Sequence, residues 1–435
     1  MGHIDSGNQS KGLRVYELVA IGVGGMIGGG IFSVLGLAVE ISGHAAPLAF
    51  AVGSLIAISA GYSYIRLALT YRKDGASFTY LERAFPKTLF IAGIAGWVVV
   101  IGYIGTLALY AFTFGAYASH LLGAEGLHFT RILLSIAVLV IFMVVNILGT
   151  KWMGRAEDVI VYIKILILAV LGAVGFFTVK PTRFSPFFNT GVHSVFMGGA
   201  LIFVAYEGFQ LITNAIEETR NPKINIPRAM YGSIAITSII YIAIAIVAVG
   251  NLDPTALIAA KEYTLAVAAN PVLGKVGVVL VDIAALFATS SAINGTLFGS
   301  SRLASEIATD SLAPRAFAFH NRTNIPIAAL VLITSMASIF TVLGGLEFIA
   351  SFSSMTFLLV SIAVSAANLR LHETTKSKIA PIIIGLALMG ITIVLLIVYI
   401  GHKNPVTLLV IGSIYAVTGA AHLLFERLRK GQNTI

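Results

Sequence analysis

Twelve long apolar stretches constrain this sequence more than any other feature. A helix needs about 20 consecutive apolar residues to cross the hydrocarbon core of a bilayer, and such stretches recur along the whole 435-residue chain. Because backbone groups in lipid must be hydrogen-bonded within the protein, the twelve apolar stretches predict an all-α polytopic membrane protein. The twelve expected spans cover residues 16–42, 47–70, 88–120, 132–148, 156–179, 192–212, 228–250, 273–307, 325–343, 346–369, 380–400 and 405–426.

The composition supports this assignment and narrows the chemistry open to the chain. Of the residues, 57% are hydrophobic and 11% are charged, and the mean hydropathy of +0.94 excludes an ordinary soluble protein. The absence of cysteine rules out disulfides, thiolate metal sites and cysteine nucleophiles. We expect no metal and no other cofactor.

The basic residues are distributed unevenly between the two sides of the membrane. With a cytoplasmic amino terminus, 20 of the 28 lysines and arginines fall inside and six fall outside, while Arg66 and Lys164 lie within spans. This asymmetry predicts an even number of spans in a multi-pass plasma membrane protein with both termini in the cytoplasm. The net charge of +9 is spread through short loops and does not form a compact basic domain, so it indicates no nucleic-acid partner.

Glycine is concentrated in the first apolar stretch, where residues 24–30 read Gly-Gly-Met-Ile-Gly-Gly-Gly. Each glycine inside a helix costs roughly 0.5–1 kcal/mol relative to alanine, so one interpretation is a break in the helix. Freed backbone groups are tolerated in a bilayer only where they line a cavity or are buried in protein, which makes a break a candidate binding site. The other interpretation is a tightly packed GxxxG face, since Gly24 and Gly28 have that spacing.

A second interruption lies in the sixth stretch, where residues 203–210 read Phe-Val-Ala-Tyr-Glu-Gly-Phe-Gln. Glu207 places a carboxylate near mid-membrane, and Gly208 weakens the helix beside it. Transporters often carry paired broken helices in corresponding positions of inverted repeats. Spans one to five and six to ten would then be two repeats, each headed by a break, which favours a cavity at the glycine stretch.

This arrangement predicts the organisation of the whole chain. We expect a cytoplasmic tail over residues 1–14, a first inverted repeat over 15–180 and a second over 190–370. A helix pair over 380–428 and a cytoplasmic tail over 429–435 complete the chain.

Lys164 in span five is a candidate for proton coupling. It lies eight residues into its span, about 12 Å at 1.5 Å per residue, and Gly24 lies at a similar depth in span one. Ser290 and Ser291 of span eight fall in the same cytoplasmic half. An ammonium there can donate to carbonyls freed near Gly24 and to a serine hydroxyl, and it can lose and regain a proton because burial disfavours its charged form. The alternatives are a snorkelling lysine or a permanent structural ion pair.

Two carboxylates inside spans have different expected roles. Glu207 can attract a cationic part of a substrate, carry a proton, or pair with a donor of the scaffold, and the sequence does not choose among these. Asp282 lies in the outer part of span eight, where we expect water to reach it and a structural role to follow.

No enzyme constellation is present. The sequence has no glycine-rich loop ending in Gly-Lys-Ser/Thr, no His-Glu-x-x-His and no Gly-x-Ser-x-Gly. The chain is therefore not expected to be an enzyme or an ATP-driven pump.

Three groups of residues resemble the amino acid, polyamine and organocation permeases. They are residues 26–32 in span one, residues 205–209 in span six, and residues 217–223 followed by 226–229 in the next loop. The resemblance extends from Val15 to about Glu426. Residues 149–151 and 154–157, which lead to Lys164, are similar to the proton-coupled branch, where a span-five lysine takes the place of sodium.

The resemblance implies a five-plus-five inverted-repeat fold of twelve transmembrane helices, with broken helices 1 and 6 holding an amino acid between them. It implies that the amides of Gly28, Gly29 and Gly30 bind the substrate carboxylate at the positive end of a half-helix. It also assigns the substrate amino group to four backbone carbonyls, those of Met26, Val204, Ala205 and Glu207.

One position departs from the family pattern. Several proton-dependent exchangers carry a glutamate two residues after the span-six glycine, where this chain has Gln210, and its carboxylate precedes the glycine as Glu207. The exchangers' proton-sensing residue therefore does not transfer, and Lys164 is the stronger candidate.

The sequence thus predicts a secondary transporter that moves amino acids by alternating access, as a proton symporter. Its partners would be the amino acid, protons and the lipid bilayer. An exchanger, or a carrier of cationic amino acids or polyamines, is the nearest alternative, and a non-transporting sensor or complex subunit is a remote one. Neither the side chain that the pocket accepts nor the oligomeric state follows from the sequence.

Overall fold

The computed structural model describes residues 12–73, 76–86, 89–148, 153–310, 312–321 and 325–432. These residues form α-helices and 3-10 helices (η), and within them the only β-type pairing is an isolated parallel bridge between Leu13 and Thr219. Residues 1–11 of the expected tail, residues 149–151 of the loop before α7, and residues 433–435 lie outside the described part. The elements are α1 Val15–Met26, α2 Gly30–Ser42, η1 Gly43–Ala45, α3 Ala46–Tyr71, α4 Ala76–Ala84, α5 Leu89–Leu121, α6 His128–Leu148, α7 Met153–Phe176, η2 Pro181–Phe184, α8 Val192–Leu201, η3 Ile202–Gln210, α9 Leu211–Asn214, α10 Pro222–Asn251, α11 Pro254–Ala259, α12 Thr264–Thr309, η4 Arg315–Ala318, α13 Ile327–Leu343, α14 Leu346–Arg370, α15 His372–Thr375, α16 Ile379–Lys403 and α17 Pro405–Gln432.

Many of these helices are suited to a membrane. In the described residues, nine helical segments are long and apolar enough to cross a bilayer, one of which, Gly30–Tyr71, joins α2, η1 and α3. Three shorter apolar helices are Val15–Met26, Ile160–Phe176 and Ile327–Leu343. The all-helical polytopic fold is therefore as expected, whereas the count of twelve spans and the inverted repeat stay predictions.

Two expected spans are interrupted in the structure. The first divides into α1 and α2, and the sixth divides into α8, η3 and α9. The eighth differs from expectation, because α12 begins at Thr264 and runs through Pro271 and a non-helical Gly274 with φ 62°. Proline removes a backbone donor and glycine adopts this conformation freely, so α12 is two helices merged across a kink.

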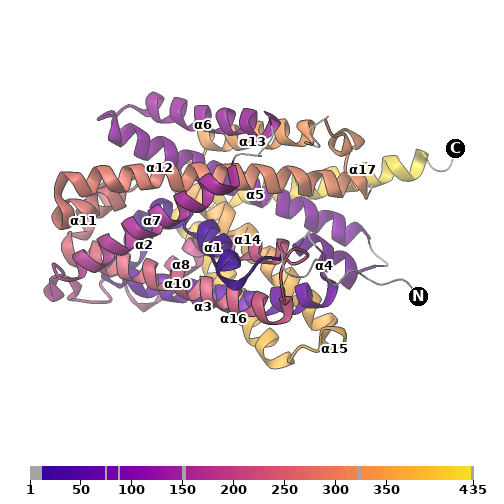
Figure 1. Ribbon diagram of the computed structural model, residues 1–435, viewed down its shortest axis with the longest axis horizontal. Coiled ribbons are helices and arrows are strands. Elements are labelled where there is room, and N and C mark those ends of the chain that lie inside the picture. Colours follow the sequence, from indigo (N-terminus) through magenta and orange to yellow (C-terminus); the bar gives the residue numbers. More distant parts are fainter. Residues whose placement is uncertain are drawn as a thin grey trace.

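Burial runs from a packed centre to an apolar exterior. The segment Val192–Asn214 is 83% buried over its most apolar window, whereas Pro405–Arg427 is only 11% buried. The outer helices nonetheless expose large apolar side chains such as Leu148, Ile384 and Leu409. A helix that is apolar on its exposed face is suited to lipid. Figure 1 shows α6 and α13 along one edge of the molecule and α16 along the opposite edge.

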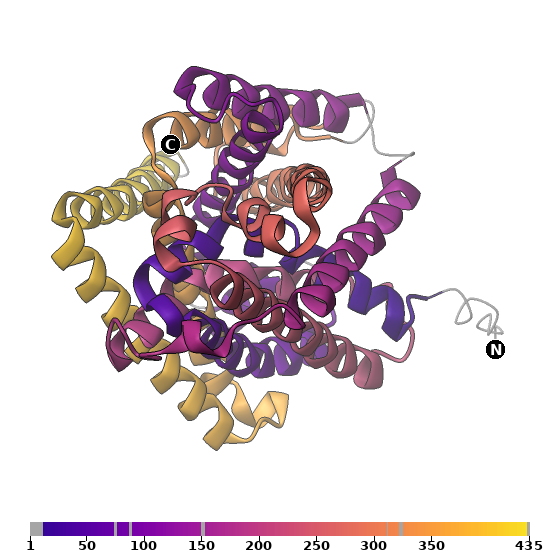
Figure 2. The ribbon, with the colours of Figure 1, turned by 90° about the vertical axis from the view of Figure 1, so that its left-hand side faces the viewer.

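The broken helices lie in the middle of the bundle. Viewed from the end where α11 lies, α16 and α17 flank one side and α6 and α13 cover another (Figure 2). The helices α4 and α15 and the carboxyl end of α17 all lie toward the end of the molecule opposite to α11 (Figure 1). The interruptions contact helices from both halves of the chain, since α1 packs on α10 and η3 packs on α3 and α14.

Candidate functional site

The first interruption is short and consists almost wholly of glycine backbone. The helix α1 ends at Met26, α2 begins at Gly30, and Ile27 and Gly29 lie between them with caps outside regular helical geometry. A Cβ added at Gly28 would lie under 3.0 Å from Ala292 of α12, closer than side chains approach in real proteins. Both interpretations of this stretch therefore apply: the helix breaks here, and its glycines are also closely packed against other helices.

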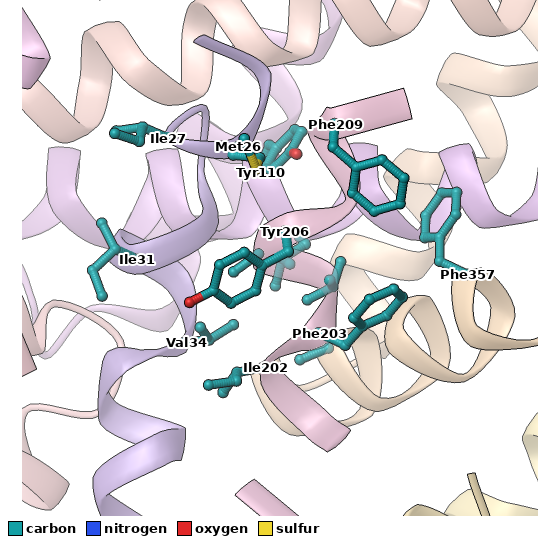
Figure 3. Packing of buried hydrophobic residues seen from close by; sticks show 14 of the residues in the cluster. Met26, Ile27, Ile31, Val34, Tyr110, Ile202, Phe203, Tyr206, Phe209 and Phe357 are labelled. Atoms are coloured by element: carbon teal, nitrogen blue, oxygen red, sulfur yellow. The ribbon is translucent and has the colours of Figure 1, made fainter. Parts of the chain in front are cut away.

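Side chains of other helices close around this break. A Cβ at Gly29 would lie under 3.0 Å from the ring of Tyr110, and one at Gly30 would lie equally close to the hydroxyl of Tyr241. Met26, Ile27 and Tyr110 lie beside the broken segment in Figure 3. Only residues without a side chain leave room for these neighbours.

The second interruption is a nine-residue 3-10 helix, η3. Runs of 3-10 helix longer than three or four residues are uncommon and often mark a functional hinge. With three residues per turn, residues three apart share a face. One face carries Ala205 and Gly208, a second carries Tyr206 and Phe209, and a third carries Val204, Glu207 and Gln210.

The contacts of η3 follow these faces. A Cβ at Gly208 would lie under 3.0 Å from backbone atoms of Gly25 and Met26, so the first face abuts the α1–α2 break. The second face packs on α3, where the Tyr206 hydroxyl donates to Phe50 O at 2.8 Å and Phe209 contacts the Tyr64 ring. Figure 3 shows Tyr206 and Phe209 leaving η3 beside the broken first helix.

Two hydroxyls satisfy backbone groups that the interruptions leave free. The Tyr241 hydroxyl of α10 lies 2.6 Å from Met26 O and 3.2 Å from Ala205 O, so it joins both interruptions. The Ser354 hydroxyl of α14 accepts from Val204 N at 3.0 Å and donates to Leu201 O. Two carbonyls that the family resemblance assigns to a substrate amino group, those of Met26 and Ala205, therefore already accept from Tyr241.

Lys164 lies beside Gly24, as their similar positions along spans five and one predicted. Its ammonium donates to Gly24 O at 2.9 Å, and the residue is fully buried. This contact joins α7 to α1 just before the break, and Val161, one turn earlier on α7, packs against Gly24. Ser290 and Ser291 are partly buried on α12, directly before the Ala292 that packs at Gly28. The arrangement can therefore link the state of one ammonium to the position of α1.

Glu207 has a different environment. The residue is 5% exposed, and it makes no hydrogen bond or ion pair within the described part of the chain. A charged group in such a place is expensive unless something neutralises it.

Comparison with known proteins connects this geometry to a family. A model of the family described as amino acid permease matches residues 13–420. The chain belongs to the amino acid permease family. The permease is 32% identical over 393 residues to an uncharacterized protein of Methanocaldococcus jannaschii, with 89% of each chain covered. It is 30% identical over 406 residues to the inner membrane transport protein YbaT of Escherichia coli, with 92% of each chain covered. It is 25% identical over 410 residues to the branched-chain amino acid permease BcaP of Bacillus subtilis, with 88% of each covered.

These matches identify the protein as an integral membrane transporter of amino acids or related compounds, a class that normally performs no catalysis. In the ranges that the structure describes, no group of three or more histidine, aspartate or glutamate side chains is placed to hold a metal.

The expectation that water reaches Asp282 of the permease is wrong. The residue is 1% exposed, and both of its carboxylate oxygens lie near His120 Nδ1, at 2.9 and 3.1 Å. His120 stands at the end of α5, and its ring stacks on Tyr263 from the segment before α12, with 4.3 Å between centroids. His120, itself stacked on Tyr263, thus binds the buried carboxylate, which the sequence alone did not reveal.

A charged cluster at the α11 end of the permease was also not foreseen. Lys261 lies 2.9 Å from Glu40, and Lys403 lies 2.7 Å from Glu40 and 2.9 Å from Glu347. The four side chains join α2, α14, α16 and the segment after α11. Because they stand at the ends of helices far apart in sequence, each looks like an ordinary helix-end charge until the fold brings them together.

Proposed function

We propose that the permease is a secondary active transporter that carries amino acids by alternating access, driven by proton symport. The single observation that carries the proton component is the hydrogen bond between the buried Lys164 ammonium and Gly24 O, at 2.9 Å. A buried ammonium with a carbonyl partner beside a helix break is suited to release and recover a proton.

The fold proposed for this cycle has twelve spans. Five spans over residues 15–180 and five over 190–370 form two inverted repeats, and the pair over 380–428 is added to them. The paired interruptions at α1–α2 and at η3 support this division, since each would stand at the head of one repeat. Both termini would be cytoplasmic, and the permease would lie in the plasma membrane.

The substrate would lie between the interruptions. The helix α2 begins at Gly30, so the amides of Gly28, Gly29 and Gly30 stand at its amino-terminal end, which suits a carboxylate. The carbonyls of Val204 and Glu207 would receive the amino group, together with those of Met26 and Ala205. Since one hydroxyl proton of Tyr241 serves two carbonyls, a substrate amino group can complete their hydrogen bonding.

Proton binding would act through α1. A protonated Lys164 holds Gly24 and thereby α1 against α7. A neutral amine is a weaker donor to a carbonyl than an ammonium, so loss of the proton loosens this contact. Ser290 and Ser291, near the break, would assist the same step.

The experiment is Lys164→Met in proteoliposomes, because methionine retains the length and apolar stem without the charge. We expect accumulation of substrate driven by a proton gradient to fall at least roughly tenfold, as for loss of a general acid-base group. Exchange of labelled for unlabelled substrate without a gradient should be affected less. Lys275→Met, at an exposed lysine, is the matched control.

Full proton-driven accumulation by the Lys164→Met protein would contradict the symport proposal. A wild-type protein that exchanges amino acids but never accumulates them under a proton gradient would identify an exchanger.

A further inference from the structure

The third face of η3 is distinguished from the other two by its unsatisfied polar groups. The first face is closed by the α1–α2 break and the second by α3, as their contacts show. The third carries Glu207 and, one 3-10 turn later, Gln210. Both residues are at least nine-tenths buried.

Both residues carry a polar group that lacks a hydrogen-bond partner among the described residues. No hydrogen bond or ion pair joins the Glu207 carboxylate to another described residue. The Gln210 amide nitrogen Nε2 is buried without a partner. Buried polar groups in native proteins are nearly always hydrogen-bonded, so two such groups on one face require an explanation. A ligand that occupies this face would supply it.

The surroundings of the carboxylate favour a positive charge. No lysine or arginine of the described part pairs with it, and its electrostatic neighbours are the buried tyrosines Tyr64 of α3 and Tyr103 and Tyr110 of α5. The Tyr64 hydroxyl is bonded to Ser77 at 2.8 Å. A buried carboxylate without a cationic partner is stabilised when an ammonium group binds beside it.

Tyr110 connects this face to the proposed carboxylate site. Its ring packs directly on Gly29, and its hydroxyl is within electrostatic range of Glu207. An amino acid with its carboxylate at Gly28–Gly30 would therefore extend its side chain past Tyr110 toward Glu207. Both ends of one substrate would be held by two different interruptions.

We propose that the third face of η3 is a subsite for a cationic side chain, with Glu207 as the counter-ion. The permease would thus prefer amino acids whose side chain ends in an ammonium group. This inference rests on the proposed transport of amino acids and adds the class of substrate. Gln210 would orient the bound side chain or the Glu207 carboxylate through its free Nε2.

The test compares ornithine with norleucine, whose side chains have the same number of heavy atoms and differ in the terminal charge. Wild-type permease in proteoliposomes should bind and transport ornithine at least roughly tenfold better than norleucine, since one missing charge partner leaves a buried group unpaired. Glu207→Gln should lose this preference, with ornithine uptake falling about tenfold or more and norleucine uptake changing less than about threefold. Glu373→Gln, an acid in the exposed segment after α14, is the control.

The possible failures are distinguishable. A wild-type protein that prefers norleucine, or a Glu207→Gln protein that keeps its preference for ornithine, would overturn the cation subsite while amino acid transport stands. Equal loss of both substrates in a correctly folded Glu207→Gln protein would do the same and would assign Glu207 to proton transfer or to the common part of the substrate. Failure of the wild type to bind or carry any amino acid would instead overturn the proposed function.

If Glu207→Gln does not fold, the comparison of ornithine with norleucine on the wild-type permease still tests the cation subsite. Thermal stabilisation of the purified permease by ornithine, but not by norleucine at equal concentration, would support the subsite, because a ligand stabilises the folded state according to its affinity. Stabilisation by norleucine alone would overturn it.

Discussion

The two interruptions of the permease differ in what they are made of. The first, between α1 and α2, is bare backbone around Ile27–Gly29, and other helices supply the side chains that surround it. The second, η3, is a continuous 3-10 helix that presents side chains of its own on three faces. Tyr241 lies between them and bonds to both.

Under the proposed function, the two interruptions would have different roles in substrate recognition. Bare backbone can recognise only what all amino acids share, such as a carboxylate held by amides. A 3-10 helix with Glu207 and Gln210 on one face can distinguish substrates by their side chains. The following variants test how firmly the two interruptions depend on each other.

Gly208→Ala should have the largest effect. The added Cβ would lie under 3.0 Å from backbone atoms of Gly25 and Met26, and backbone cannot move aside as a flexible side chain can. Overpacking of this kind costs about 1–3 kcal/mol and occasionally more. We expect a large fall in melting temperature and loss of transport, measured on purified protein and in proteoliposomes.

Gly299→Ala is the matched control for this change, because a Cβ there would meet nothing within 4 Å. If Gly208→Ala melted at the same temperature as Gly299→Ala, the close approach of the two interruptions would be wrong.

Ser354→Ala should destabilise the second interruption by an intermediate amount. It removes the hydroxyl that joins Val204 N and Leu201 O, and buried unpaired groups cost about 1–3 kcal/mol. Ser33→Ala is the counterpart at the first interruption, where the Ser33 hydroxyl donates to Gly29 O at 2.6 Å. Since the Ser33 amide also donates to Gly29 O, at 2.9 Å, the second variant should melt nearer to wild type. The reverse order of melting temperatures would contradict this comparison.

Tyr241→Phe should have a smaller effect on stability than Gly208→Ala or Ser354→Ala. It removes one hydroxyl from Met26 O and Ala205 O but keeps the ring, and a typical hydrogen bond contributes about 0.5–1.5 kcal/mol. Because the two carbonyls then lack this donor, we expect substrate binding, measured by thermal stabilisation, to change more than folding. Unchanged ligand stabilisation in Tyr241→Phe would separate the hydroxyl from the substrate site.

The sequence predicted the helical membrane fold well, and it placed both interruptions. Apolar length and glycine content are local properties, so the divisions at α1–α2 and at η3 could be inferred without contacts. It also placed Lys164 and Gly24 at equal depth, where the structure joins them by a hydrogen bond. The roles of these residues in transport stay predictions.

Other parts of the site could not be predicted. Tyr241, Tyr110 and Ser354 lie inside apolar spans, where a tyrosine or serine gives no sign of which helix it will meet. Asp282 was expected near water, because depth along a helix does not show that the residue is buried and bonded to His120.

By itself, then, the sequence determined that the permease consists of long apolar helices and where two of them break, because hydrophobic length and helix propensity act along the chain. Only the tertiary structure decided which groups satisfy the broken backbone and which are left unpaired. Those partners come from helices far away in sequence, and their meeting depends on how the helices cross. The way the helices cross leaves the buried Glu207 carboxylate without a partner among the described residues, whereas the Tyr241 hydroxyl donates to Met26 O at the first interruption.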